Sequence, residues 1–195
     1  MKSLCVYCGS SFGASPLYTD AARDLAKVFV ERDIALVYGG GNVGLMGVIA
    51  DEVMRLGGTI TGVIPTALLK CEVGKRNVTH LHIVDNMHER KAKMADLSDG
   101  FIAMPGGIGT LEELFEVMTW SQLGFHDKPI GVLNVDGYYD ALLAFIQHTV
   151  AQGFLKAHQA ELLMVESNAI ELLGRFDSFE AQPHDKLLNL VRTEG

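Results

Sequence analysis

The sequence contains no long apolar run, few cysteines and fewer basic than acidic residues. No segment approaches the roughly 18 uninterrupted apolar residues of a membrane-spanning helix. The opening segment MKSLCVYCGS has neither the apolar core nor the small-residue cleavage site of a secretory signal. The 16 Lys and Arg residues against 24 Asp and Glu give a formal net charge of -8, which disfavours general nucleic-acid binding. We therefore expect a cytoplasmic protein that binds neither membranes nor nucleic acids.

The three cysteines are too few and too scattered for a disulfide framework, so we expect free thiols. Cys5 and Cys8 form a C-x-x-C pair, but no second pair completes a four-thiolate zinc site. His80 and His82 alternate on an expected strand and Asp85 follows, which imitates a metal site without a third ligand fixed in space. Hydrogen-bonded strand histidines explain this pattern more simply, and we expect no metal.

Short runs rich in Val, Ile and Leu alternate with longer segments of helical period, as in βαβ units with a parallel sheet. The expected strands are Leu4–Tyr7, Ala35–Tyr38, Thr59–Ile64, Leu81–Val84, Gly100–Met104, Ile130–Leu133 and Leu162–Val165. The expected helices are Pro16–Arg32, Gly44–Leu56, Met87–Leu97, Leu111–Leu123, Tyr138–Gln152 and Ala169–Phe176. We predict a single α/β domain over residues 1–176, with a mainly parallel sheet covered by helices on both faces, and a polar tail at residues 177–195.

Three of the expected strands end in loops of small residues that lead into helices. These loops are Cys8–Ser11, Gly39–Gly44 and Pro105–Thr110. Glycine lets the backbone approach a ligand closely, and the N–H groups at a helix start favour an anion such as a phosphate. Glycine-rich turns also serve simply to tighten packing, but two of them, with Thr110 as a hydroxyl donor and expected helix cap, favour a nucleotide or sugar phosphate.

Neither glycine-rich loop has the form used by the common nucleotide cofactors. The loop Gly39–Gly44 does not fit G-x-G-x-x-G and follows the second strand instead of the first, which disfavours a nicotinamide cofactor. No G-x-x-x-x-G-K-[ST] sequence is present, so the lysine of a P-loop NTPase is missing. We expect no cofactor.

Charged residues lie beside the expected ligand edge of the sheet. Glu112 and Glu113 fall in the first turn after the third glycine loop, where acidic residues serve chemistry or simply complement the helix dipole. Arg90 and Lys91 lie near the start of another helix, where they can hold a phosphate or sugar hydroxyls or can simply be solvated. Spacing alone leaves both alternatives open.

The run PGGIGTLEE at Pro105–Glu113 resembles the PGGxGTxxE signature of the Lonely Guy family of cytokinin riboside monophosphate phosphoribohydrolases. The runs Gly39–Gly47, Met87–Lys91 and Thr119–Asp140 extend this resemblance from the first strand to about Phe154. The resemblance implies a Rossmann-like, doubly wound fold and hydrolysis of the N-glycosidic bond of adenosine 5′-monophosphate-type nucleotides. It also implies a homodimer whose active sites draw on both subunits, with the expected helix over residues 111–123 as a candidate for the twofold contact.

Carried over position by position, the resemblance implies that Arg90 and Glu113 are the catalytic residues. The implied substrate-binding positions are Glu72, Lys91, Gly106, Gly107, Ile108, Gly109, Thr110, Leu111, Glu112 and Thr119. Around Glu72 the sequence LLKCEVGKRNVTHLHIVDN departs from the more acidic, glycine-bearing pattern of the family. This departure leaves open how the base is recognised and whether N6-modified adenine is preferred.

The mechanism that fits these residues is hydrolysis through an oxocarbenium-like ribosyl transition state. Glu113 would activate water or stabilise the cation, while the third glycine loop anchors the 5′-phosphate. A non-catalytic nucleotide or molybdenum-cofactor carrier on the same fold is the alternative, and it needs the phosphate loops without the Arg90 and Glu113 pair. A pyridoxal-phosphate decarboxylase, the label that family members once carried, needs a Schiff-base lysine, and no lysine here has a recognisable context.

Overall fold

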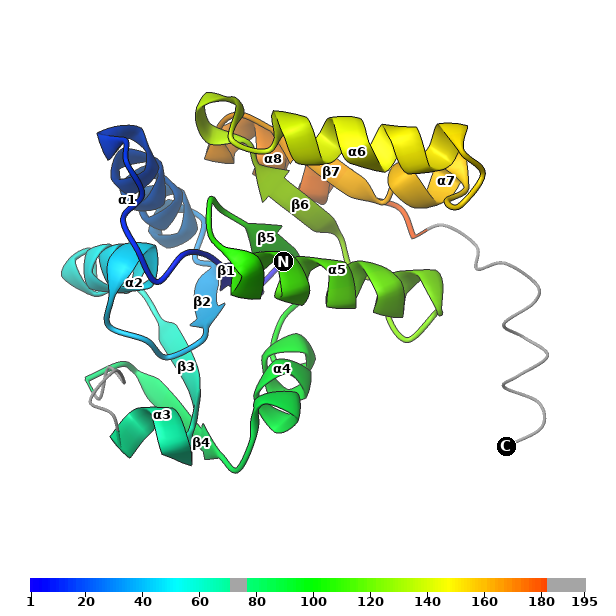
Figure 1. The fold of residues 1–195 in the computed structure, drawn as a ribbon. Helices are drawn as coiled ribbons and strands as arrows, with labels where there is room; N and C mark the ends of the chain where they lie inside the picture. Colours follow the sequence, from blue (N-terminus) through cyan, green and yellow to red (C-terminus); the bar gives the residue numbers. More distant parts are fainter. Residues whose placement is uncertain (71–76, 182–195) are drawn as a thin grey trace.

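The computed structural model describes residues 1–70 and 77–181 and contains one seven-stranded parallel sheet with the strand order β4-β3-β2-β1-β5-β6-β7 (Figure 1). The strands are β1 Ser3–Tyr7, β2 Ala35–Tyr38, β3 Ile60–Pro65, β4 His80–Val84, β5 Phe101–Ala103, β6 Ile130–Leu133 and β7 Leu163–Glu166. Each expected strand is confirmed, because short β-branched runs bounded by glycines are typical of buried parallel strands.

The helices largely follow the expected segments. They are α1 Pro16–Glu31, α2 Gly44–Arg55, α3 Thr66–Lys70, α4 Met87–Asp96, α5 Ile108–Gln122, α6 Asp140–Ala151, α7 Ala157–Ala160 and α8 Ala169–Asp177, with a 3-10 turn η1 at Val135–Gly137. The short helices α3 and α7 were not expected, because so few residues show no periodicity. Helix α5 begins at Ile108 instead of Leu111, since N–H groups in a first turn need no partner and Gly109 is tolerated there.

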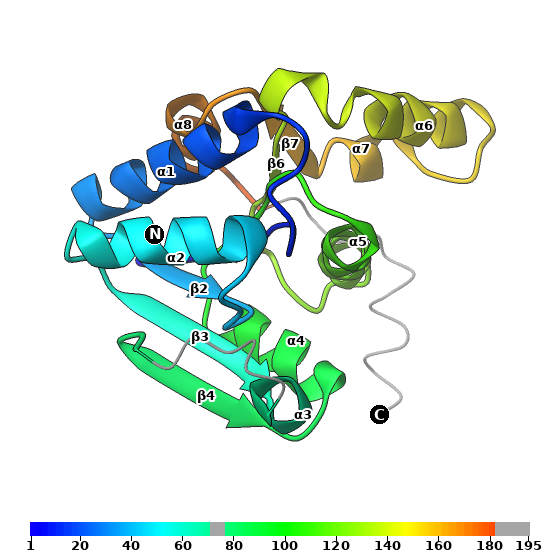
Figure 2. The same cartoon turned by 60° about the vertical axis from the view of Figure 1, so that its left-hand side comes forward.

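Helices cover both faces of the sheet (Figure 2). An apolar layer on each face holds them against it. Alternation along β1 sends Leu4 and Val6 into one layer, and Cys5 and Tyr7 into the other. The first layer is completed by α1, α2 and α8, and the second by α4, α5, α6 and α7. This arrangement confirms the expected α/β class with helices on both faces.

The strand order reverses direction between β1 and β5. From β1 the chain winds outward through β2, β3 and β4, and from β5 it winds the other way through β6 and β7. Loops that leave neighbouring strands in opposite directions open a crevice at the carboxyl edge, where ligands bind in such folds. Here the loops are also joined, since Gly9 N donates to Pro105 O at 3.0 Å and Leu45 N donates to Gly9 O at 3.0 Å.

Contacts with the core continue beyond the expected end of the domain. Helix α8 ends at Asp177, whose carboxylate pairs with Arg32 at 2.9 Å, and Phe179 packs against the first apolar layer. The division into residues 1–176 and a tail stays a prediction, since residues 182–195 lie outside the described part. No helix within residues 1–70 and 77–181 has the length and apolar character needed to cross a membrane.

Candidate active site

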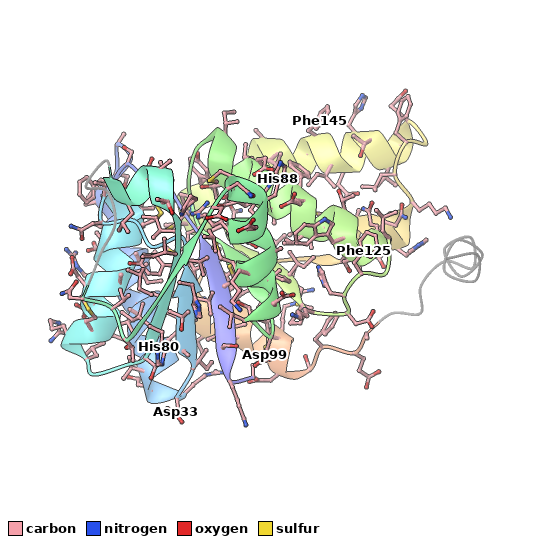
Figure 3. All side chains as sticks on the ribbon, turned by 90° about the horizontal axis from the view of Figure 1, so that it is seen from below. Asp33, His80, His88, Asp99, Phe125 and Phe145 are labelled. Atoms are coloured by element: carbon pink, nitrogen blue, oxygen red, sulfur yellow. The ribbon has the colours of Figure 1, made fainter. Side chains whose placement is uncertain are left out.

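The third glycine loop and the charged start of α4 meet at a cavity of about 280 Å³ at the carboxyl edge of the sheet. The cavity is lined by Cys8, Gly9, Ser10, Met46, Met87, Arg90, Gly107, Ile108, Gly109, Thr110, Glu112 and Glu113. Figure 3 shows the two ends of the parallel strands. His88 of α4 lies at the carboxyl end, and Asp33, His80 and Asp99 lie at the amino end. The loops after β1 and β5 and the first turns of α2, α4 and α5 thus contribute to one site.

Arg90 and Glu113 form an ion pair at the base of this cavity. Arg90 Nη1 donates to Glu113 Oε1 at 2.9 Å, and the two side chains are 9% and 11% exposed. The Nε atom of Arg90 donates to the carbonyl oxygen of Val63 in β3 at 3.3 Å. Arg90 is therefore not a solvated residue of a helix start. A buried ion pair that opens on a cavity is a candidate functional site.

The local sequence of α4 explains why Arg90 faces inward. Asn86 caps the helix by accepting a hydrogen bond from Glu89 N at 2.9 Å. Met94 and Ala95 lie in the second apolar layer, one helical turn beyond Arg90 and Lys91. Residues four apart share a helix face, so the apolar contacts of Met94 and Ala95 direct both cations toward α5.

Burial sets the acidity of the Glu113 carboxyl. Loss of solvent raises its pKa above the ordinary value, while the charge and hydrogen bond of Arg90 oppose that rise. The net direction is upward, so Glu113 is a stronger proton acceptor than an exposed glutamate. A carboxylate with a raised pKa beside a cation suits general-base chemistry.

Lys91 belongs to a second ionic group beside the pair. Its ammonium contacts Glu112 Oε1 and, at 2.9 Å, Glu116 Oε1, while its side chain is 9% exposed. Burial lowers the pKa of Lys91, but the hydrogen bonds to the two carboxylates outweigh this and the pKa lies above its ordinary value. Lys91 does not line the cavity, so its expected contact with substrate stays a prediction.

The first turn of α5 presents backbone N–H groups to the cavity. Gly107 is the N-cap, and no side chain caps this end of the helix. The expectation that Thr110 caps α5 is therefore wrong, because the helix starts earlier and Thr110 lies inside the first turn. A Cβ atom on Gly106 would overlap the Thr110 hydroxyl, so this glycine allows the threonine to pack there. Uncapped N–H groups with the helix dipole favour an anion.

Like Lys91, three more of the expected substrate-binding residues do not line this cavity. Gly106 lines an adjoining cavity of about 260 Å³, which shares Gly107 with the first. Leu111 packs against the second apolar layer. Thr119 lies further along α5, where its hydroxyl donates to Phe115 O at 2.7 Å. Glu72 lies outside the described residues.

Several residues that shape the site could not be recognised from the sequence. Met46 and Met87 line the cavity but carry no signal beyond their place in the family motifs. Tyr138 donates to Gly106 O at 2.6 Å, and Tyr139 donates to Met104 O at 2.6 Å. These tyrosines brace the third glycine loop. Only the tertiary structure reveals this contact, since the partners are more than 30 residues apart.

The cysteines and histidines add no further reactive centre to the described part of the chain. Cys5 and Cys8 are free and buried, and burial raises the pKa of both thiols. Thiols in that state are poor nucleophiles. Within residues 1–70 and 77–181, no group of three or more His, Cys, Asp or Glu residues is arranged to hold a metal ion.

Comparison with known proteins assigns this site to a family. The family model described as possible lysine decarboxylase matches residues 46–176. A probable cytokinin riboside 5′-monophosphate phosphoribohydrolase of Oryza sativa subsp. japonica is 52% identical over 90% of this chain and 79% of its own. A cytokinin riboside 5′-monophosphate phosphoribohydrolase of Arabidopsis thaliana is 50% identical over 92% and 78%. The chain belongs to the Lonely Guy family.

A solved structure supports the Rossmann-like fold of this Lonely Guy family member. The molybdenum cofactor binding protein from Rippkaea orientalis has a TM-score of 0.68 and 20% sequence identity, covering 91% of this chain and 97% of that one. At such low identity the likeness concerns the fold alone. The expected resemblance and fold class are both confirmed.

Proposed function

We propose that the protein hydrolyses the N-glycosidic bond of adenosine 5′-monophosphate-type nucleotides and releases a free purine base and ribose 5-phosphate. The observation that carries this proposal is the buried Arg90–Glu113 pair, which opens on the same cavity as the uncapped start of α5. Relatives about 50% identical are named for this reaction on cytokinin riboside 5′-monophosphates. A carrier needs the anion site but has no use for the pair.

The 5′-phosphate binds at the start of α5. The N–H groups of Ile108, Gly109 and Thr110 lie in a first turn without a side-chain cap, and all three residues line the cavity. A helix N-terminus holds a phosphate through these N–H groups and its dipole. The phosphate then lies about one helical turn from Glu113, which directs the ribose toward the carboxylate.

Glu113 acts on the water that attacks C1′ of the ribose. In this step the bond from C1′ to the base nitrogen breaks, a bond from C1′ to the water oxygen forms, and Glu113 accepts a proton from the water. The leaving base takes up a proton from solvent, and Glu113 returns its proton to solvent, so that one water molecule is consumed in total. Arg90 holds the Glu113 carboxylate in place and orients the nucleotide, and the developing ribosyl cation is stabilised by the nearby negative charge.

Apolar side chains around the cavity suit the purine base. Met46, Met87 and Ile108 all line it, and Ile108 is 82% exposed at its rim. Flexible thioethers adapt to ligands of different shape. Both plain and N6-substituted adenine are therefore candidate bases, and the choice between them is a matter for measurement.

The decisive experiment incubates the purified protein separately with AMP, N6-isopentenyl-AMP and adenosine, and follows free base and ribose 5-phosphate by chromatography. We expect release from the two monophosphates and none from adenosine, because adenosine lacks the group that the α5 N-terminus holds. The relative rates rank the two bases. No release from any of the three contradicts the proposal and favours a non-catalytic nucleotide carrier.

We also propose that the protein is a homodimer, formed through α5 and α6, whose active sites draw on both subunits. An apolar groove of about 270 Å³ there is lined by Phe115, Met118, Thr119, Gln122, Phe145, Ile146, Thr149, Phe154 and Leu155. Phe145 and Phe154 are 61% and 88% exposed, which is costly for phenylalanine in a monomer. Figure 3 shows Phe125 and Phe145 on the same flank of the molecule.

Phe145→Glu tests the dimer, because it places a charge in the groove. Sedimentation velocity should show a monomer, and turnover should fall if the sites are shared. Ile170→Glu is the matched control, since Ile170 is 66% exposed on α8, which packs on the other face of the sheet. A wild-type protein that sediments as a monomer would rule the dimer out.

We also propose a cytoplasmic location, on the basis of the free thiols Cys5 and Cys8.

A further inference from the structure

The glycine that follows β2 lies directly against the guanidinium group of Arg90. A Cβ atom built on Gly39 would overlap Arg90 Nη2 and lie 2.8 Å from Cζ and 3.3 Å from Nε. Among the glycines of the described residues, Gly39 alone would meet Arg90 in this way. From this contact we infer that Gly39 is a positioning residue, whose missing side chain leaves the space in which Arg90 reaches Glu113. The inference rests on the proposed function of that pair.

Three neighbours together define where the guanidinium lies. The carbonyl oxygen of Val63 accepts from Nε, the carboxylate of Glu113 accepts from Nη1, and the Gly39 backbone packs against the side that carries Nη2. Gly39 directly follows β2 and Val63 lies in β3, the strand paired with β2. An added methyl group on Gly39 would occupy the arginine's place, and the flexible arginine would be the group to move.

The neighbouring glycines show that this requirement is specific. A Cβ atom on Gly41 would meet only the side chain of Met46, and Cβ atoms on Gly107 and Gly109 would have nothing within 4 Å. Gly39 is also absent from the residues with a positive φ, so its backbone does not itself demand glycine. Space for Arg90, and not backbone conformation, is what requires glycine at this position.

Moving Arg90 has a consequence for the protonation of Glu113. The titratable and charged groups that act on the carboxyl or are influenced by it are Arg90 and Lys91 from α4, Glu112 from α5, Cys5 and Tyr7 from β1, and Cys8 just after β1. Glu116 from α5 pairs with Lys91. Arg90 is the main group that opposes the effect of burial. Its displacement raises the pKa of Glu113 further and leaves more of the carboxyl protonated at neutral pH.

Gly39→Ala tests the inference. We expect kcat to fall by about 10²-fold, because a displacement of about 1 Å in a catalytic group costs roughly this much. KM should change less than kcat, because the phosphate site at α5 is untouched and only the contact of Arg90 with the nucleotide is altered. The acidic limb of the pH–rate profile should move to higher pH, a shift that mere loss of stability does not produce. Gly174→Ala on α8 is the control, since its Cβ atom would have nothing within 4 Å, and it should leave kcat and the profile unchanged.

A readout independent of turnover separates this inference from the proposed function. The ¹³C resonance of the Glu113 carboxyl, assigned with Glu113→Gln, reports its pKa in the wild type and in Gly39→Ala. A higher pKa in Gly39→Ala supports the inference even if the wild type releases no base, an outcome that contradicts the proposed function alone. Unchanged kcat, pH profile and Glu113 pKa in a folded Gly39→Ala protein would overturn it.

If Gly39→Ala does not fold, the double variant with Arg90→Lys decides the question. Lysine has no guanidinium group at the place that the alanine methyl group occupies. Recovery of the folded state in the double variant, measured by circular dichroism and thermal melting, shows that the conflict is with Arg90. A double variant that also fails to fold contradicts the inference, because the methyl group would then conflict with something else.

Discussion

Helices α4 and α5 are joined by two groups of charged side chains that start from consecutive residues. Arg90 pairs with Glu113, and Lys91 pairs with Glu112 and Glu116. Both cations are buried to a similar degree. However, the guanidinium of Arg90 lines the cavity and the ammonium of Lys91 lies between the helices.

The two groups differ in whether a side chain remains able to exchange a proton with a ligand. Glu113 is buried with one partner, so its pKa is raised and it can take up a proton during a reaction. Lys91 has two carboxylate partners, which raise its own pKa and keep it charged. The proposed chemistry therefore belongs to the first group, whereas the second joins α4 to α5. Burial of a charge does not by itself identify a catalytic residue.

The largest effect is expected from removing the reactive pair. Glu113→Gln keeps an oxygen that accepts from Arg90 but cannot take up a proton, and Arg90→Ala removes the orienting cation. Turnover should fall by about 10²–10⁴-fold in each. Base release from AMP or N6-isopentenyl-AMP measures this, with melting temperature as the check on folding. Retained turnover in either folded variant would remove that residue from the mechanism.

The second prediction concerns the pH dependence of turnover. Glu113 must be ionised to accept a proton, and its pKa is raised by burial. The rate should therefore rise with pH through a midpoint above the ordinary range of a glutamate, and fall about tenfold per pH unit well below it. The pH–rate profile of kcat measures this. A midpoint at the value of an exposed glutamate would mean that another group limits the rate.

A smaller effect on turnover, but a measurable loss of stability, is expected for Lys91→Met. Methionine fills a similar volume and leaves Glu112 and Glu116 without their shared partner, at a cost of about 1–2 kcal/mol in the free energy of unfolding. Urea denaturation measures the loss. Lys27→Met is the matched control, because Lys27 pairs with Asp24 on the surface at 2.8 Å and such exposed pairs contribute little. If Lys91→Met abolishes turnover without loss of stability, Lys91 takes part in the reaction and its proposed structural role is wrong.

Much of the fold could be predicted because its signals are local. Buried parallel strands are nearly continuous apolar runs, and Ser15, Pro16 and Asn86 mark helix starts in the sequence itself. The start of α5 was placed too late because glycines in a first turn look like a loop. The helices α3 and α7 were missed because their four or five residues have no measurable period.

The candidate site was predicted less completely than the fold. Arg90 and Glu113 were selected through the family motifs, and their catalytic role stays a prediction, while the carboxyl edge was selected through the general rule for parallel sheets. The contact of Gly39 with Arg90 was not found, since it joins positions 51 residues apart that no pattern connects. The glycines after β2 were assigned to phosphate binding, whereas the structure places Gly39 against the arginine.

The sequence by itself determined the class of fold, the order of its elements and the family, because these depend on local periodicity and on contiguous motifs. Only the tertiary structure decided which buried cation faces the cavity. Arg90 and Lys91 are adjacent on one helix turn and chemically alike, and about 100° of rotation around α4 separates them. That rotation, together with the space at Gly39 and the carboxylates of α5, directs one cation to the cavity and the other into the contact between two helices.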